Sequence, residues 1–142
     1  MNEPVPLPIP TAKPIIKKIK LVAGGVYLLR DKAVRIPDGD KKVGGRTAHE
    51  FRVVLLLSNQ TICNSIACPV VSIVPLSSKL TPRAETDLII GRTSKNGLDK
   101  DSRVMFGYIQ PVMKDEFERH LGELDEAQWD QIMGKVVWNF DR

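Results

Sequence analysis

Short apolar runs separated by polar turns dominate the middle of the chain, and this pattern predicts β-strands. The clearest strand covers residues 52–58, because its apolar run from Val53 to Leu57 is typical of a strand buried on both faces. A second strand is expected at about residues 66–76, after a polar turn, and it ends at two adjacent hydroxyls, Ser77 and Ser78. The same reasoning predicts strands at residues 26–30, 86–90 and 103–112, and a helical turn at residues 114–120.

The end of the chain has the periodicity of an amphipathic helix. Asp125 is a candidate N-cap, with Gln128 three residues later as in a capping box. Apolar residues then recur at the spacing of one helix face: Trp129, Ile132, Met133, Val136 and Val137. We expect this stripe to pack against the sheet, and a dimer contact is the alternative.

These elements predict a mainly β (α+β) domain. The expected architecture is an SH3-like small barrel of five or more mostly antiparallel strands, with the C-terminal helix laid over it. The domain is expected to occupy residues 23–142. Residues 1–22 form a separate N-terminal extension, because five prolines in its first 14 residues exclude a helix and favour extended chain. We expect it to be a flexible tail or an arm laid on the surface.

Composition narrows the class of protein. A chain of 142 residues with 42% hydrophobic residues fits one domain with a single core. No run approaches the ~18 apolar residues of a membrane helix, and the N-terminus does not resemble a signal peptide, so we expect a cytoplasmic protein. Cys63 and Cys68 are the only cysteines, which gives no disulfide framework and only a weak metal signal. No metal and no cofactor are expected.

Charge is unevenly distributed along the chain. Residues 1–113 carry 17 Lys and Arg against 9 Asp and Glu, whereas residues 114–142 carry 4 against 8. A basic body is typical of proteins that bind a polyanion such as nucleic acid, and a solvated surface of mixed charge is the alternative. The long polar loop at residues 31–50 is expected to be functional, and its cations are Lys32, Arg35, Lys41, Lys42 and Arg46.

Candidate chemistry gathers at the ends of the two central strands. If residues 52–58 and 66–76 pair antiparallel, Arg52 comes close to Ser77 and Ser78. A guanidinium beside hydroxyl donors suits a phosphate. With His49 as a proton carrier, such a set can cleave RNA without a metal, since the neighbouring 2′-hydroxyl is the nucleophile. The ordinary alternative is a surface ion pair for Arg52 and turn caps for the serines.

At these residues the sequence resembles the MazF/PemK family of toxin ribonucleases from toxin–antitoxin pairs. The resemblance covers about residues 24–140. Four segments carry it in the family's order: Gly25-Val26-Tyr27-Leu28, Arg52-Val53-Val54-Leu55-Leu56-Leu57-Ser58, Val74-Pro75-Leu76-Ser77-Ser78 and Gly122-Glu123-Leu124.

The resemblance implies an activity, partners and site residues. It implies a homodimer that cuts single-stranded RNA at short sequences without a metal ion, and a cognate acidic antitoxin that covers the basic groove. Arg52 matches the family's catalytic Arg, Ser77 its catalytic Thr, and His49 is a candidate acid or base. The candidates for substrate binding are Ser78, Lys41, Lys42, Arg46 and Gln110.

Three departures from the family's pattern leave other functions open. Val53 replaces the proline after the catalytic Arg, and Phe51 replaces the residue before it. The Asp-Gln pair of the late strand is missing, and its place falls on Gly107-Tyr108 or on Ile109-Gln110. A different base, an altered RNA preference or weakened activity would follow. The rivals are a CcdB-type toxin that acts by protein contact, and an inactive SH3-like barrel that serves as a binding module.

Overall fold

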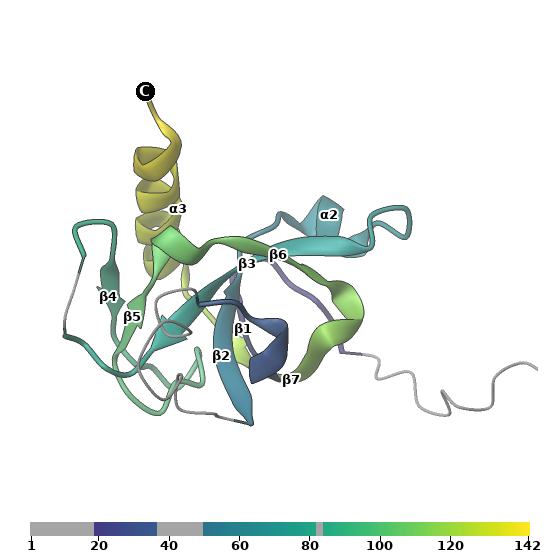
Figure 1. Ribbon diagram of the computed structural model, residues 1–142, viewed down its shortest axis with the longest axis horizontal. Coiled ribbons are helices and arrows are strands. Elements are labelled where there is room, and N and C mark those ends of the chain that lie inside the picture. Colours follow the sequence, from purple (N-terminus) through teal and green to yellow (C-terminus); the bar gives the residue numbers. More distant parts are fainter. Residues whose placement is uncertain (1–18, 37–49, 82–83) are drawn as a thin grey trace, which may run out of the picture.

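The computed structural model describes residues 19–36, 50–81 and 84–142 (Figure 1). Residues 1–18 and the predicted site residues Lys41, Lys42, Arg46 and His49 lie outside these ranges. The strands are β1 (Gly25–Arg30), β2 (Phe51–Leu56), β3 (Val70–Ser77), β4 (Leu88–Ile90), β5 (Ser102–Val104), β6 (Gln110–Met113) and β7 (Phe117–Glu123). The helices are α2 (Gln60–Asn64) and α3 (Glu126–Phe140), with 3₁₀ turns η1 (Asp31–Ala33), η2 (Phe106–Tyr108) and η3 (Lys114–Glu116). The mainly β class with a C-terminal helix is confirmed.

The strands pair antiparallel in the order β4-β5-β3-β2-β1-β7, and β6 also pairs with β3. β3 therefore changes partner along its length: its first half lies beside β6 and its end lies beside β5. Pro75 stands between these two stretches, where its missing N–H breaks no ladder bond, and its carbonyl accepts a hydrogen bond from the Met105 backbone N–H (3.1 Å). This switch brings the end of β3 against β5.

Alternate side chains of β1, β2 and β3 fill two cores on opposite faces of the sheet. The first core contains Tyr27, Leu29, Val54, Leu56, Ile73, Met105 and Phe117. The second contains Val26, Leu55, Val74, Val104, Phe106 and Ile132. Because Ile132 comes from α3, the helix covers the second core, and the face of the first core is left to η1, α2 and β7.

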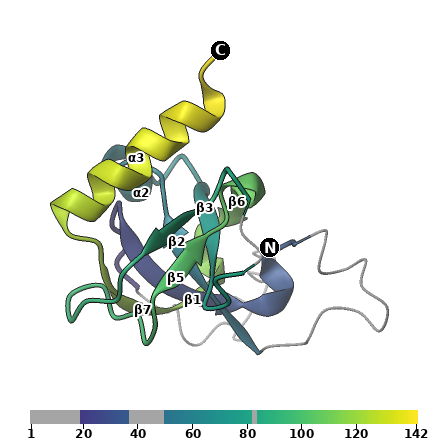
Figure 2. The ribbon, with the colours of Figure 1, turned by 90° about the vertical axis from the view of Figure 1, so that its left-hand side faces the viewer.

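The C-terminal helix begins as the sequence predicts. The Asp125 carboxylate accepts a hydrogen bond from the Gln128 backbone N–H at 2.8 Å, so the predicted N-cap is confirmed. Ile132 is fully buried, but Val137, which was expected in the same stripe, is 64% exposed. The end of α3 extends past the sheet (Figures 1 and 2), so Val137 does not reach the second core on which Val136 still packs.

Two predictions of secondary structure were wrong around β7. The expected helical turn at residues 114–120 is a short 3₁₀ turn followed by strand β7, which pairs with β1. The Phe117 ring, almost fully buried, packs edge-on against Tyr27 with the ring centroids 5.0 Å apart. The expected strand at residues 103–112 is likewise broken by η2 into β5 and β6, because the two pieces pair with different parts of β3.

Among the described helices, none is long and apolar enough to cross a membrane.

Candidate functional site

Arg52 is the second residue of β2, and the alternation of the strand turns its side chain to the face of Val54. Its Nε donates a hydrogen bond to Asp31 Oδ1 at 3.2 Å, and the two side chains are only 16% and 11% exposed. Asp31 opens η1 directly after β1, and its backbone N–H donates to the Glu50 carbonyl (3.1 Å). The 3₁₀ turn therefore holds a carboxylate against one edge of the guanidinium and orients the rest of its donors.

Ser77 is the last residue of β3, and its position relative to Arg52 follows from the pairing of the strands. The antiparallel pairing of β2 with β3, on which the sequence argument depended, is present, with Val54 opposite Pro75 as its last pair. The same register carried two residues further sets Arg52 opposite Ser77, on the same face of the sheet. The Ser77 Oγ accepts a hydrogen bond from the Lys79 backbone N–H (3.1 Å), so its own O–H can still donate. Ser78 is exposed in the turn that follows.

Arg103, which sequence reasoning did not select, stands on the other side of Ser77. In the pairing of β3 with β5, Ser77 lies directly opposite Arg103. Side chains of directly opposed residues project from the same face, with Cβ atoms about 5 Å apart. The Arg103 Nη1 donates to Asp87 Oδ2 at 3.3 Å, and these side chains are 15% and 6% exposed. Ser77 is thus flanked on one face by two strands that each carry an arginine held by an aspartate.

The only sequence signal for Arg103 was its position next to an apolar strand. Arg52 has the same signal, but it also precedes a long apolar run that marks it as the start of a central strand. β5 is three residues long, and its pairing with the end of β3 arises only from the change of partner at Pro75. The two aspartates come from η1 and from the turn before β4, which are far apart in the sequence from the arginines that they contact.

Gln110 was predicted to bind substrate, and the structure gives its side chain three bonds within the protein. Its Oε1 accepts from the Arg35 backbone N–H (2.8 Å), and its Nε2 donates to the carbonyls of Arg35 and Tyr108 (both 2.9 Å). The amide therefore braces the segment after η1 against β6. Its role toward a substrate stays a prediction.

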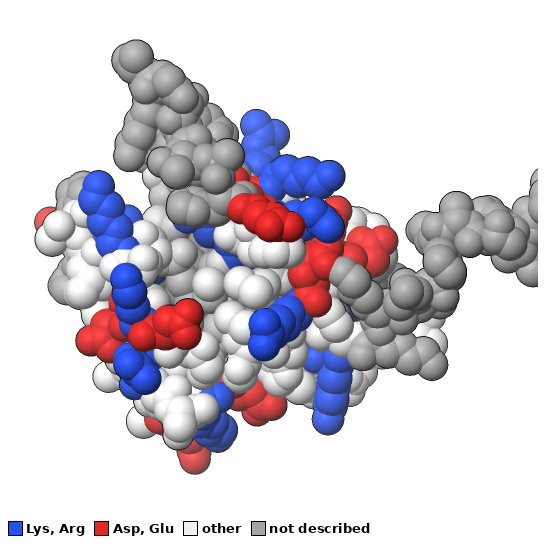
Figure 3. Space-filling model, turned by 90° about the horizontal axis from the view of Figure 1, so that it is seen from below, with Lys and Arg blue, Asp and Glu red and all other residues white. Residues whose placement is uncertain are grey.

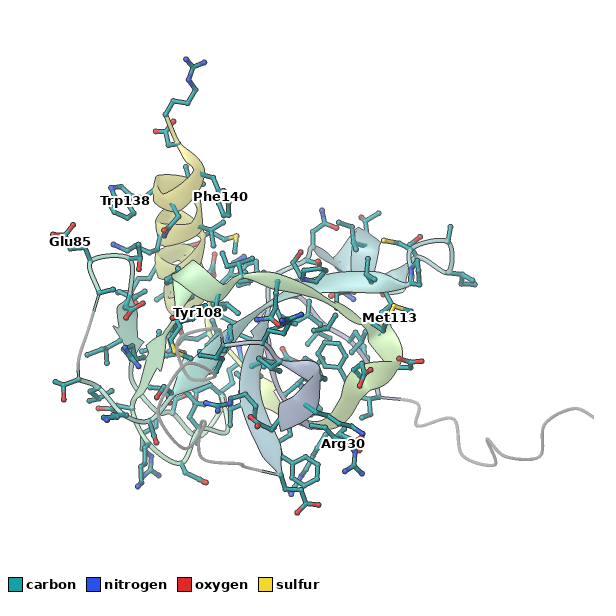
Figure 4. The ribbon with its side chains drawn as sticks, viewed as in Figure 1. Arg30, Glu85, Tyr108, Met113, Trp138 and Phe140 are labelled. Atoms are coloured by element: carbon teal, nitrogen blue, oxygen red, sulfur yellow. The ribbon has the colours of Figure 1, made fainter. Side chains whose placement is uncertain are left out.

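Of the two placements expected for the family's late-strand acid, the one at Gly107 lies on an open surface, whereas Ile109 is half-buried against the second core. Gly107 is exposed, and a Cβ atom built on it meets nothing within 4 Å. Its neighbour Tyr108 is half-buried and lies near the centre of the view in Figure 4. The carboxylates that contact the two arginines are instead Asp31 and Asp87.

Positive and negative charges are mixed on the face of the molecule that Figure 3 shows. Figure 3 shows Lys and Arg side chains among Asp and Glu, with neither sign forming one broad patch among the described residues. Arg30, which points outward in Figure 4, pairs with Glu118 (3.3 Å) and lies 5.8 Å from the centre of the Phe51 ring. Within the described part of the chain, no three His, Cys, Asp or Glu side chains gather in a way that could hold a metal ion.

The fold and this geometry define a small antiparallel β-domain with arginines and hydroxyls at the end of its central strands. The family of PemK-like, MazF-like toxins of type II toxin–antitoxin systems has a sequence model that matches residues 34–140. Because this match covers well over half of the chain, the chain belongs to that family. The resemblance seen in the sequence is confirmed. No curated protein sequence matches the chain.

Solved structures agree on the fold. An endoribonuclease in complex with its cognate antitoxin from a mycobacterial species is 19% identical, with 84% of this chain and 91% of that chain covered and a TM-score of 0.57. The Mycobacterium tuberculosis toxin MazF-mt6 is 17% identical (82% and 96% covered, TM-score 0.59). A MazE-MazF structure from Deinococcus radiodurans is 14% identical (87% and 98% covered, TM-score 0.60). At these identities the likeness concerns the fold.

Proposed function

We propose that this toxin is an endoribonuclease that cleaves single-stranded RNA, including mRNA, at short sequences without a metal ion, and thereby arrests growth. The observation that supports the proposal is the β2–β3 register, whose last pair is Val54 with Pro75. Continued by two residues, this register brings Arg52 opposite Ser77 on one face. Membership of the MazF/PemK family supports it, and so do structural neighbours that are described as endoribonucleases. A cytoplasmic location is part of the proposal, because mRNA is there.

The proposed reaction uses the RNA's own 2′-hydroxyl. Its oxygen attacks the adjacent phosphorus and loses its proton, while the bond from phosphorus to the 5′-oxygen breaks and that oxygen gains a proton. The products are a 2′,3′-cyclic phosphate and a 5′-hydroxyl. Negative charge builds on the non-bridging oxygens in the transition state, where preorganised donors stabilise it most. Arg52 pairs with this charge and the Ser77 O–H donates to one of the oxygens.

The remaining predicted residues have roles around this reaction. His49 is proposed to move the proton, and Asp31 to hold the Arg52 guanidinium in place through the 3.2 Å contact. Lys41, Lys42 and Arg46 are proposed to gather the RNA backbone, with Ser78 and Gln110 as further contacts. Each phosphate that a cation neutralises on single-stranded RNA lowers the slope of log affinity against log salt by about 0.7, so binding weakens as salt rises.

We also propose two protein partners. An acidic antitoxin is proposed to cover the face that binds RNA, and structural neighbours that contain an antitoxin support this. A second copy of the chain is proposed to cover the end of α3, because Val137, Trp138 and Phe140 there are 56–70% exposed. Trp138 and Phe140 extend to opposite sides of that end of the helix in Figure 4. Large apolar side chains that stay this exposed within one turn of a helix are ones that a partner can bury.

The test is cleavage of a long RNA by purified protein in EDTA. The native toxin is expected to cut the RNA at defined positions. Arg52→Ala is expected to lose about 100-fold or more in cleavage per folded molecule, with the folded fraction of the variant measured by circular dichroism. Arg119→Ala is the matched control, because Arg119 is an exposed arginine on β7. Cleavage by Arg52→Ala at the native rate would show that the site is elsewhere. A native protein that is toxic but cuts no RNA would favour the CcdB-type alternative, and one that is neither toxic nor active would favour the binding module.

A further inference from the structure

We propose that Arg103 is a second phosphate ligand of the site and that Asp87 positions it. This inference rests on the proposed ribonuclease function and deepens it, because it adds a cation that neither the sequence nor the family comparison assigns. Its starting point is the direct pairing of Ser77 with Arg103 across β3 and β5.

The strand pairing puts Ser77 between the positions of two arginines. Ser77 lies opposite Arg103 on one side. On its other side, the β2–β3 register continued two residues past its last pair, Val54 with Pro75, brings Arg52. All three side chains belong to the face of the first core. Arg52 is two residues from Val54 and Arg103 is two residues from Met105, and both of these apolar residues are part of that core. The Arg103 Nη2 also lies 3.8 Å from the Met105 sulfur. Adjacent strands lie about 4.8 Å apart, so the two spacings from β2 to β3 and from β3 to β5 separate the arginine positions by about 10 Å. A phosphodiester at Ser77 is within reach of both long side chains.

Asp87 is suited to positioning because it is itself fixed from two directions. Its Oδ2 accepts from the Ala84 backbone N–H (3.1 Å) as well as from Arg103, and the residue is buried. The same turn is fastened to α3, since the Lys135 Nζ donates to the Glu85 carbonyl at 2.9 Å. Figure 4 shows Glu85 beside the helix. The carboxylate is therefore part of a rigid support rather than a mobile counter-ion.

The chemistry explains why a second arginine matters. The scissile phosphate carries one charge before attack and gains more as the phosphorane forms, shared by two non-bridging oxygens. One guanidinium on each side of Ser77 can pair with one oxygen each, and the fork of donors makes each contact directional. Because the charge grows in the transition state, a contact from Arg103 is expected to act more on kcat than on KM.

A purely structural ion pair would behave differently. Arg103 and Asp87 are both largely buried, and removing one partner of such a pair destabilises a fold whatever its function. The experiment therefore needs a readout that folding alone does not move. Sulfur substitution of each non-bridging oxygen at the scissile phosphate provides it, because it reports which oxygen a given residue contacts.

The experiment measures kcat and KM on a short RNA with one cleavage site, and repeats this with the two phosphorothioate diastereomers. The proteins are the native chain, Arg103→Lys, the double variant R103A/D87A, and the exposed-arginine control Arg119→Ala. We expect R103A/D87A to lower kcat by about 100-fold with a small change in KM. In this double variant, the rate on the normal RNA divided by the rate on one of the two phosphorothioate diastereomers should fall toward one. Arg103→Lys should recover part of kcat, because lysine keeps the charge but not the fork.

The outcomes separate this inference from the function on which it rests. Two results would show that Arg103 is structural and would overturn the inference, provided that the native toxin cleaves the RNA. In the first, the Arg103 variants keep the native kcat. In the second, they lose activity only in proportion to their unfolded fraction, and the ratio of the rates on the oxygen and sulfur substrates is the same as for the native toxin. If the native toxin does not cleave RNA at all, the proposed function fails, and the inference fails with it.

Discussion

At the scale of single residues, Tyr27 shows how one buried polar group ties the start of the described chain to the sheet. Its hydroxyl donates to the Lys20 carbonyl (2.7 Å) and accepts from the Val22 N–H (2.9 Å). The ring is fully buried against Phe117, and it stacks on His120 with the ring centroids 4.8 Å apart. Burial disfavours the charged phenolate and raises the pKa of Tyr27 from 10.0 to about 12.

This raised pKa predicts a loss of stability at high pH. The unfolded chain releases the phenol proton at about pH 10 and the folded protein only at about pH 12. The contribution of the protonated Tyr27 to the free energy of unfolding is therefore fully present below pH 10. It is lost as the pH rises to 12, and the free energy of unfolding falls by up to about 1.4 kcal/mol per pH unit. In a Tyr108→Phe background, where Tyr27 is the only tyrosine, phenolate absorbance should titrate near pH 12 while the fold persists. A titration near pH 10 in folded protein would contradict the account.

The site could be predicted residue by residue only where one strand carried the information. Arg52 and Ser77 stand next to long apolar runs, so the sequence could place them at the ends of adjacent strands. Arg103, Asp31 and Asp87 could not be found in this way, because their contacts depend on turns and on strand partners far apart in the chain.

At the scale of elements, Asn96 connects the loop after β4 to the first turn of α3. The side chain is fully buried, and its Oδ1 accepts from the backbone N–H groups of Thr93 and Leu98 (3.0 and 3.1 Å). Its Nδ2 donates to the Gly91 carbonyl (2.9 Å) and to Gln128 Oε1 (3.2 Å). One amide thus fixes the loop and orients the helix.

Substitution of this amide should destabilise the whole fold. We expect Asn96→Ala to lower the free energy of unfolding by about 2 kcal/mol or more, because several buried backbone groups lose their partner. Denaturant unfolding followed by circular dichroism measures this. Asn64→Ala, at an exposed asparagine of α2, is the control and should change stability by less than about 0.5 kcal/mol. Equal effects of the two substitutions would show that the Asn96 network contributes little.

Long apolar runs and the helix with its cap were predictable at this scale, whereas β7 was not. Residues 117–123 alternate poorly between apolar and polar, and only Phe117 is buried in them. The strand forms because the backbone N–H and C=O groups at the edge of β1 need hydrogen-bond partners. The local sequence of residues 117–123 does not reveal this requirement. Similarly, Asn59 caps the short helix α2 in a stretch where the sequence predicted only a polar turn.

At the scale of the whole molecule, the exposed end of α3 predicts self-association. The Lys135 Nζ lies 4.1 Å from the centre of the Trp138 ring, and this contact orients the exposed indole. Sedimentation over a range of concentrations should show a dimer for the native toxin and a larger monomer fraction for Trp138→Ser. A native protein that stays monomeric, or a dimer that Trp138→Ser leaves unchanged, would exclude this surface as the contact.

The central claim is that a strand-end arginine and serine cleave RNA through its own 2′-hydroxyl. The most direct measurement is the chemistry of the ends after a defined RNA is incubated in EDTA with the native toxin or with Arg52→Ala. The account predicts fragments that carry a 5′-hydroxyl and a 2′,3′-cyclic phosphate at a short recurring sequence, and intact RNA with the variant. Fragments with a 5′-phosphate, or the same fragments at the same rate with Arg52→Ala, would contradict it.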